Sequence, residues 1–527
     1  MQRSLPLLLA TLLVLPLLTV RANADNVGAI VIEGPIPSPF PAYDLDANAN
    51  ITAGRPAADL GLTEEEFFYS GMADVYTYEE GNAHLGQKVL KTADAPYKTR
   101  MIVRRPANAA DFNGTVVIES MNSTAGFDTT PVWIPSAEYF AREGIVYIGV
   151  TTSGNQAIEF LKPHFQQIPV PPFFDFFGCG GLSPSCGSRY ASLAMSDNGQ
   201  EYEMVNQLAT ALKTDGGPLP GDFGPVSRVF MSGQSQQGGS VITHAGEFHF
   251  ANIDGYFFMG ASGARALSND APRLQGAERL VPTNLPVPVY RGSSEGDVRD
   301  GSTRQADTDT SATASFRLIE VPGTSHNPVH KVDILGLPLS FFCVNEAASL
   351  ADGPVFGSYV WNAMWENMRI QVDDGVTPPN APRIEIDGGV IQRDEFANAI
   401  GGVRLPEMDV PTASYFSPNN AGKPLCVDPG APPFPACIPS FPGLPDIFLR
   451  LIAGLGCGLV GSQAPFDQQT LSEMYVERDF YRDMVEERAE ALTAARFLLE
   501  DDERKIVSTA DEVDFPELEE EEEDEDD

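Results

Sequence analysis

Six short runs of apolar residues between positions 111 and 332 constrain the fold of this chain more than any other feature. The runs are "TVVIE", "IVYIGV", "RVFMSG", "DGYFFM", "VPVYRG" and "FRLIEV". Such runs are typical of parallel strands that are covered on both faces, because neither face of the strand meets water. Segments with helical spacing, such as "SAEYFAREG" and "EYEMVNQLATALK", stand between them. We therefore predict an α/β fold with an open, mostly parallel central sheet and antiparallel strands before it.

The remaining segments are predicted to flank this core. The predicted parts are a signal peptide at 1–24, a β-rich N-terminal segment at 25–110, the α/β core at 111–332 with an insert at 155–190, a C-terminal part packing on the core at 333–510, and a disordered acidic tail at 511–527. In the C-terminal part, an apolar helical face is predicted to pack on the core. This face consists of Met484, Val485, Ala489, Leu492, Ala495 and Leu499.

The N-terminus predicts export. One early arginine, Arg3, precedes a short apolar run, and the small residues Ala22 and Ala24 directly precede a cleavage site. This is the pattern of a secretory signal peptide cut near Ala24, and no later run is long enough for a membrane helix. We expect a secreted or periplasmic protein that does not insert stably into a membrane.

Six cysteines fit an oxidising compartment. Two pairs lie close enough in sequence to clip loops, which leaves a third pair, although six cysteines allow 15 connectivities. The candidate pairs are Cys179 with Cys186, Cys426 with Cys437, and Cys343 with Cys457. Because the sequence has no C-x-x-C pair or His/Cys cluster, we expect no metal or organic cofactor.

The formal net charge of −39 disfavours nucleic acid and anionic surfaces as partners. Part of this charge lies in the terminal run "ELEEEEEDEDD". A run of like charges is expected to be solvated, and cation or basic-partner binding is its less favoured role.

Two serines compete for the role of a nucleophile. A literal G-x-S-x-G pattern surrounds Ser294 in "GSSEG", whereas Ser235 in "GQSQQGG" has Gln237 where the second glycine would stand. A nucleophile elbow requires a buried strand, a sharp turn and a helix with small residues. "RVFMSG" and "QQGGSVITHAG" supply these around Ser235, with Gly238 and Gly239 allowing close approach, but the polar segment after Ser294 cannot form the helix. Ser235 is therefore the predicted nucleophile.

The partners of Ser235 are expected downstream, in the order acid then histidine. Strand "VPVYRG" is followed by Glu295, which its spacing favours as the acid, and by Asp297, which stays open as the alternative. Strand "FRLIEV" leads into "PGTSHNP", which presents His326. His326 would accept the proton of Ser235, and the carboxylate would orient the imidazole.

An oxyanion hole would complete the site. Its donors are expected to be the backbone N–H of Gln236 and a group near Asn122 or Ser123, in the loop after "TVVIE".

The insert after "IVYIGV" contains a cluster of phenylalanines at the sheet edge where ligands bind in such folds. They could line an apolar substrate pocket, or they could simply pack the loop onto the body. The residues are Phe173, Phe174, Phe176 and Phe177.

Several segments resemble the exported bacterial proteins called α/β-hydrolase domain-containing proteins. They include "EEFFYSGMADVY", "FNGTVVIESMNSTAGFD", "GQSQQG", "RQADTDTSATASFRLIEVPGTSH" and "GGVRLPEMDVPTASY". The resemblance spans nearly the whole mature chain and implies an α/β-hydrolase fold and ester hydrolysis, without indicating a particular ester. The relatives usually have a small residue where this chain has Gln237.

The functional hypothesis is an exported serine hydrolase that cleaves small or polymeric carboxylic esters. Two alternatives stay open: an amidase, peptidase or acyltransferase with the same triad, and a non-catalytic ligand-binding protein on this scaffold.

Overall fold

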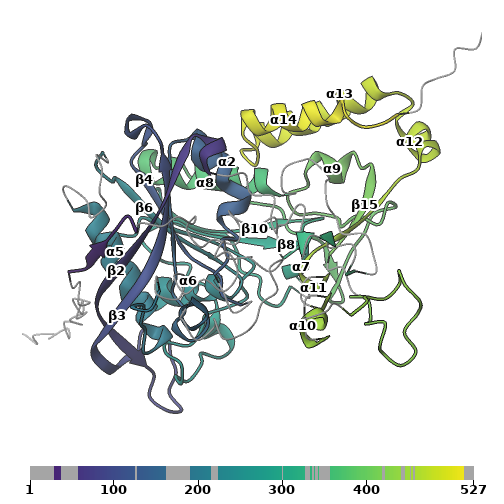
Figure 1. Ribbon diagram of the computed structural model, residues 1–527. Coiled ribbons are helices and arrows are strands. Elements are labelled where there is room, and N and C mark those ends of the chain that lie inside the picture. The colour runs from purple at the N-terminus through teal and green to yellow at the C-terminus, as the bar shows by residue number, and fades with distance from the viewer. Residues whose placement is uncertain are drawn as a thin grey trace, which may run out of the picture.

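The computed structural model of the chain shows a sheet flanked by helices, with a loop-rich C-terminal part (Figure 1). It describes residues 29–36, 57–124, 128–161, 190–214, 224–298, 301–326, 357–417, 422–440 and 457–515, with short pieces between 333 and 343 and between 446 and 454. The predicted signal peptide, most of the insert and the end of the acidic tail lie outside these residues.

A ten-stranded sheet forms the centre, in the order β1-β2-β3-β5-β4-β6-β7-β8-β10-β9. The six predicted apolar runs supply the strands β4 (Thr115–Ser120), β5 (Val146–Val150), β6 (Arg228–Gln234), β7 (Gly255–Met259), β8 (Val289–Ser294) and β10 (Ala314–Val321). These six strands pair in parallel with one another. The predicted mostly parallel α/β sheet is confirmed.

Antiparallel strands flank the parallel part on both sides. The long strands β2 (Leu62–Thr77) and β3 (Val89–Pro106) form a hairpin, and β3 joins the parallel strands through β5. The short strands β1 (Val31–Glu33) and β9 (Thr308–Ser311) add to the two edges. The predicted antiparallel strands before the core are therefore present.

Helices cover both faces of the sheet because alternate side chains of each strand point to opposite faces. One core contains Val117, Phe230 and Phe257 with residues of α2 (Trp133–Arg142) and α8 (Ser358–Asp374). The other core contains the neighbouring strand residues with α5 (Glu201–Lys213) and α6 (Gln236–Glu247). In Figure 1, α2 and α8 lie above the strands and α6 lies below them.

The C-terminal helices α13 (Arg478–Ala494) and α14 (Glu500–Ala510) pack beside the first of these cores. Val485, Ala489 and Leu492 are buried there, as the apolar face predicts. Ala495 is exposed, because α13 ends one residue before it. The predicted face is therefore correct within α13.

The other elements are short. The helical ones are η1 (Ala57–Leu60), η2 (Ala109–Asp111), η3 (Gly154–Ile158), α3 (Glu159–Leu161), η6 (Asn198–Gln200), η7 (Gly276–Arg279), α7 (Glu295–Val298), α9 (Pro406–Asp409), α10 (Asp446–Leu451), α11 (Cys457–Leu459) and α12 (Gln468–Tyr475). The strand pairs are β11 (Asp333–Ile334) with β12 (Leu337–Pro338), β13 (Ile386–Asp387) with β14 (Val390–Ile391), and β15 (Ala413–Phe416) with β16 (Ser462–Pro465). In the described part of the chain, no helix has the length and apolar character needed to cross a membrane.

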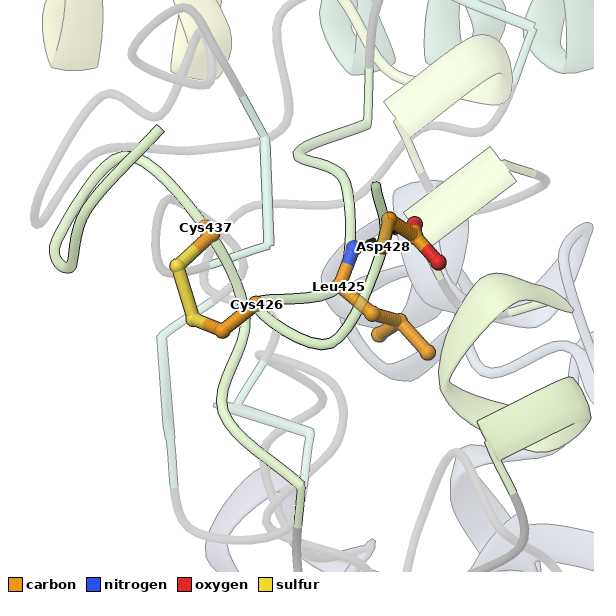
Figure 2. The surroundings of a disulfide bond; sticks show 4 residues. All are labelled: Leu425, Cys426, Asp428 and Cys437. Atoms are coloured by element: carbon orange, nitrogen blue, oxygen red, sulfur yellow. Dashed lines mark hydrogen bonds between the residues drawn. A yellow bond between two sulfur atoms is a disulfide. The ribbon is translucent and has the colours of Figure 1, made fainter. Parts of the chain in front are cut away.

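Two disulfides fasten the loops of the C-terminal part. Cys343 pairs with Cys457, and Cys426 pairs with Cys437. Figure 2 shows the second bond beside Asp428, whose carboxylate accepts a 3.1 Å hydrogen bond from the backbone N–H of Leu425. These two predicted pairings are confirmed, and the third candidate pair, Cys179 with Cys186, lies outside the described residues.

Candidate active site

Ser235 stands at a sharp turn between β6 and α6. Its backbone has φ 56° and ψ −115°, a conformation that non-glycine residues rarely adopt and that elsewhere marks nucleophile elbows. The turn is held from the neighbouring strand, because the Ser235 N–H donates a 2.9 Å hydrogen bond to the carbonyl of Met259. Glycines make the close approach possible. A Cβ on Gly233 would lie 2.7 Å from the carbonyl oxygen of Gln237, and one on Gly238 would lie 2.8 Å from the Cβ of Ala261.

A chain of short contacts joins Ser235, His326 and Asp297. The Nε2 of His326 lies 2.8 Å from the Oγ of Ser235, and its Nδ1 lies 2.5 Å from Oδ1 of Asp297. The backbone carbonyl of His326 accepts a 2.8 Å hydrogen bond from Nε2 of Gln234, which ties this loop to the elbow. The structure thus brings together a hydroxyl, an imidazole and a carboxylate in the order that acyl transfer requires.

The environment of Asp297 favours its ionised form. Burial opposes ionisation, but the charge of His326 and hydrogen bonds from His326 and Ser294 outweigh it and hold the pKa of Asp297 below its usual value. An ionised carboxylate at this place would fix the tautomer of His326 and stabilise its cation.

Glu295 does not take the place beside His326, and the preference for Glu295 over Asp297 was wrong in this respect. Its carboxylate is 1% exposed and is fully engaged elsewhere. It accepts a 2.5 Å hydrogen bond from Nη2 of Arg393 and a 2.8 Å bond from the backbone N–H of Gly323. The physical reason is the short helix α7. Residues two apart on one helical turn point in different directions, so only one of the two acids can face the histidine.

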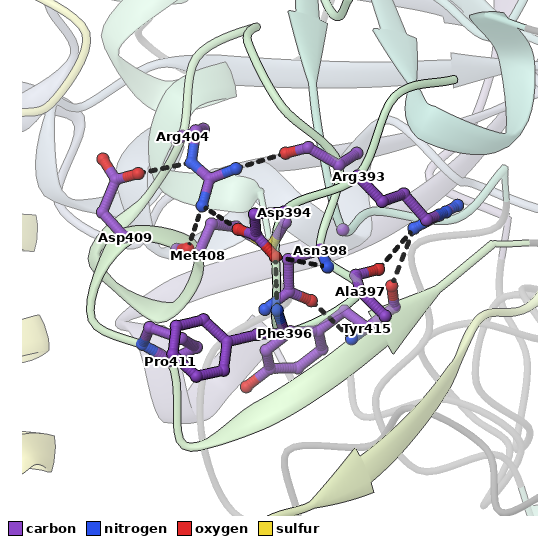
Figure 3. A network of polar contacts seen from close by, with 12 residues as sticks. Arg393, Asp394, Phe396, Ala397, Asn398, Arg404, Met408, Asp409, Pro411 and Tyr415 are labelled. Carbon is purple, nitrogen blue, oxygen red and sulfur yellow. Dashed lines mark hydrogen bonds and ion pairs between the residues drawn. The ribbon is translucent and has the colours of Figure 1, made fainter. Parts of the chain in front are cut away.

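Arg393 links Glu295 to a polar network in the C-terminal part. Figure 3 shows Arg393 directed toward the carbonyls of Ala397 and Tyr415, at 2.9 and 3.5 Å. Glu295 therefore connects this network, through hydrogen bonds from Arg393 and from Gly323, to the turn that leads to His326.

Ser294, the serine of the literal G-x-S-x-G pattern, lies in the same site but in a different role. It is the last residue of β8 and is 5% exposed. Its Oγ donates a 2.7 Å hydrogen bond to Oδ2 of Asp297, and its backbone N–H donates to the same oxygen at 3.2 Å. Ser294 therefore supports the carboxylate.

The loop after β4 lies beside the elbow, as expected for an oxyanion hole. Asn122 is excluded as a donor there, because its amide group donates to the carbonyl and side chain of Gln234 and its backbone N–H donates to Thr129. The Ser123 Oγ bonds Gln156 and Gln236. Among the described residues, the backbone N–H of Ser123 has no acceptor, and that of Gln236 begins α6, where no intrahelical acceptor exists. The backbone N–H groups of Ser123 and Gln236 are therefore the remaining candidates for the donors of the oxyanion hole.

Gln237, the unusual residue of the elbow, is fully buried in a polar network. Its side-chain NH2 donates to Oγ1 of Thr152 at 2.5 Å, and its side-chain oxygen accepts from Arg265 and from Ser240, both at 2.8 Å. The Ser240 hydroxyl also lies 2.9 Å from a carboxylate oxygen of buried Glu201, and its single hydrogen can be donated to either of these two acceptors. Because each polar group finds a partner, a large amide can stand where a small residue is usual.

Comparisons with known proteins identify the family. A family model described as an alpha/beta hydrolase domain matches residues 32–508. The chain belongs to this family. A search of curated proteins finds no match to it.

Solved structures similar to this α/β hydrolase include enzymes at low identity. A glucuronoyl esterase from Solibacter usitatus is 10% identical, with 56% of this chain and 84% of that chain covered and a TM-score of 0.26. An alpha-beta serine hydrolase homologue from Coxiella burnetii is 11% identical, with 44% and 85% covered and a TM-score of 0.26.

A cavity of about 1130 Å³ is lined by the catalytic candidates of this hydrolase, Ser235, His326 and Asp297. Most of its other described lining is polar, including Asn155, Asn198 and four arginines. The predicted phenylalanine pocket, Phe173, Phe174, Phe176 and Phe177, lies outside the described residues. No cluster of three or more metal-binding side chains occurs within the described ranges.

Sequence reasoning missed the arginines of this cavity. Three of them, Arg265, Arg273 and Arg279, lie in the connection between β7 and β8, and Arg291 lies within β8 itself. Two signals could have found them. The connection leaves the carboxyl edge of the sheet, where ligands bind, and a charge inside an apolar strand requires a reason.

Gly260→Ala is expected to lower the activity of this hydrolase by about 100-fold or more while the protein stays folded. Gly260 has φ +62°, and a Cβ there would lie 3.0 Å from Cε1 of His326 and 3.3 Å from Oδ2 of Asp297. The control is Gly61→Ala, since Gly61 has φ +73° with nothing within 4 Å of the added Cβ. Ester hydrolysis and circular dichroism measure both variants. Equal activity losses in the two would show that backbone strain, not displacement of His326, is responsible.

Proposed function

We propose that this α/β hydrolase is an exported serine esterase that cleaves carboxylic esters through an acyl-enzyme on Ser235. The observation that carries the proposal is the chain of contacts from Ser235 through His326 to Asp297 at a strained elbow. Support for export comes from the signal-peptide pattern and from two disulfides, which persist in oxidising compartments.

The first half of the reaction forms the acyl-enzyme. The Oγ of Ser235 attacks the ester carbonyl while Nε2 of His326 takes its proton, and Asp297 stabilises the resulting imidazolium. The backbone N–H groups of Gln236 and Ser123 would hold the oxyanion of the tetrahedral intermediate. When the intermediate collapses, His326 returns the proton to the departing alcohol.

The second half repeats these steps with water. His326 removes a proton from water, which attacks the acyl carbon, and the proton then passes to Ser235 as the carboxylic acid leaves. The protein side chains supply every proton transfer that this cycle needs.

The lining of the cavity favours a polar ester over a long aliphatic one. Amide, hydroxyl and guanidinium groups line the cavity beside a similar amount of apolar surface, and these polar groups would lose hydration without compensation if a long alkyl chain filled the cavity. We expect rates to fall as the acyl chain lengthens.

Hydrolysis of p-nitrophenyl esters of increasing acyl length, beside matched p-nitroanilides, tests the function. The expected result is ester turnover much faster than anilide turnover, with stoichiometric labelling of Ser235 by a fluorophosphonate. Comparable anilide rates would favour an amidase or peptidase. A folded protein that neither turns over an ester nor takes the label would be a ligand-binding protein on this scaffold.

A further inference from the structure

Four arginines line the cavity that holds Ser235 and His326. They are Arg265, Arg273, Arg279 and Arg291. This concentration of positive charge stands in a protein with a formal net charge of −39. Among the described lining residues, two are carboxylates, Glu201 and Asp297.

The cavity arginines differ from most other described arginines in having no ion pair. Arg304, Arg383 and Arg404, for example, each hold a carboxylate within 4.0 Å, as many arginines of this chain do. None of the four cavity arginines has such a partner among the described carboxylates. Arg265 interacts electrostatically with Glu201, and Arg291 does so with Asp297 and Glu320, so the charges of Arg273 and Arg279 are the ones left for a ligand that enters the cavity.

The two lining carboxylates do not cancel this charge. Asp297 is paired with His326 at 2.5 Å. Glu201 is buried among hydroxyl and amide groups, and burial raises its pKa although Arg265 opposes this effect. Arg273 and Arg279 are exposed toward solvent and remain without a counter-charge among the described residues.

Arg291 adds a buried guanidinium group to the lining of this cavity. Its side chain is 3% exposed, and its Nη1 and Nη2 donate to the carbonyl and hydroxyl of Thr303 at 2.7 and 3.1 Å. Its Nε is buried and has no hydrogen-bond partner among the described residues. A buried unsatisfied donor of this kind costs free energy unless a ligand or water bonds to it.

The connection between β7 and β8, which carries Arg265, Arg273 and Arg279, is anchored close to the turn at Ser235. The N–H of Arg265 donates to Oγ1 of Thr243 at 2.8 Å, on α6, and the N–H of Ala264 donates to the carbonyl of Arg279 at 2.7 Å. A Cβ on Gly239, one helical turn after Ser235, would lie 2.8 Å from Cγ of Arg265. The guanidinium groups are thus carried by a loop that is fixed to the helix of the nucleophile.

We infer that the substrate is an ester bearing a carboxylate away from the bond that is cleaved, and that Arg273 and Arg279 bind this carboxylate. The inference rests on the proposed esterase function and adds the substrate class. Guanidinium groups bind carboxylates through paired, charge-assisted hydrogen bonds, so Arg273 and Arg279 suit a planar anion that enters the cavity they line.

The test compares anionic and neutral substrates that share the same reacting bond. For the acyl side, the pair is the 4-nitrophenyl half-ester of adipic acid and the 4-nitrophenyl ester of adipic acid monoamide. For the alcohol side, the pair is 3-acetoxybenzoate and 3-acetoxybenzamide. Each ratio of kcat/KM is measured for the wild type, for the double variant Arg273→Gln with Arg279→Gln, and for Arg478→Gln. Arg478 is the control because it is exposed, lacks a described ion pair, begins α13 and is not among the residues that line the cavity.

The expected result is an anionic preference of about tenfold in at least one pair, as two partly exposed charge-assisted contacts would provide. The double variant should lose this preference, Arg478→Gln should keep it, and added salt should weaken it. No preference in either pair, or a preference that survives in the double variant, overturns the inference. Turnover of the neutral esters by the wild type shows in the same experiment that the esterase proposal itself holds.

A binding measurement keeps the inference testable without turnover. Calorimetry is run on the wild type and on the double variant with adipic acid monoamide. This compound has the carboxylate of the anionic substrates but no ester bond to hydrolyse. Binding that weakens about tenfold in the double variant supports the inference. Absent binding, or equal binding by both proteins, overturns it even if ester hydrolysis is observed.

Discussion

Alanine in place of Ser235 is expected to reduce kcat/KM for p-nitrophenyl esters by a factor of about 10⁴ or more. Without the Oγ, His326 has no nucleophile to activate, and only substrate binding and the oxyanion donors remain. Alanine keeps the Cβ and with it the backbone strain at φ 56°, so the alanine variant should be about as stable as the wild type. Hydrolysis rates and thermal unfolding of the purified mature chain provide the measurement.

Ser294→Ala is the matched control for this experiment. Ser294 is the serine of the literal G-x-S-x-G pattern, and its hydroxyl donates one hydrogen bond to Asp297. Losing that bond should cost about tenfold or less in rate, since the backbone N–H of Ser294 still donates to the same carboxylate. A larger loss in Ser294→Ala than in Ser235→Ala, or a fluorophosphonate adduct on Ser294, would contradict the assignment of the nucleophile.

Asp297→Asn is expected to lower kcat/KM by about 10⁴-fold, whereas Glu295→Gln should stay within about fivefold of the wild type. An asparagine beside Nδ1 of His326 cannot stabilise the imidazolium and favours the wrong tautomer. The Glu295 carboxylate instead binds Arg393 and Gly323, so its replacement weakens a support and leaves the reacting groups in place.

Thermal unfolding separates the two acids further. Glu295→Gln should lower the free energy of unfolding by about 1–3 kcal/mol, because it removes the carboxylate charge that strengthens the buried hydrogen bonds from Arg393 and Gly323. Asp297→Asn should change stability less than it changes rate. If Glu295→Gln loses activity a thousandfold and Asp297→Asn does not, the acid is Glu295 and the geometry of α7 changes when substrate binds.

The fold could be predicted from the sequence because its signals are local. Each of the six apolar runs became a parallel strand, since a strand covered on both faces must be apolar along its whole length. The face of α13 was readable for the same reason, as helical spacing puts Val485, Ala489 and Leu492 on one side. Strand order across the sheet is set by pairing between distant segments, and the sequence contains no local signal for it.

The candidate site divides in a similar way. Ser235 and His326 each follow a predicted strand, so their shared edge of the sheet could be anticipated from alternation alone. The choice between Glu295 and Asp297 could not, because both lie in one short loop. The sequence also could not show that Asn122 is unavailable as an oxyanion donor. Its side-chain amide donates to Gln234 and its backbone N–H donates to Thr129.

The sequence by itself determined the α/β architecture and the strand ends that carry the serine and the histidine, whereas it left the disulfide pairings as candidates among 15 connectivities. Tertiary structure decided which carboxylate faces His326, why Gln237 fits the elbow, and that Arg265, Arg273, Arg279 and Arg291 line one cavity. The physical reason is the distance along the chain over which each kind of interaction acts. Apolar periodicity and turn chemistry act between near neighbours, whereas the direction of a polar side chain is set by donors, acceptors and charges supplied from elements far away in the chain.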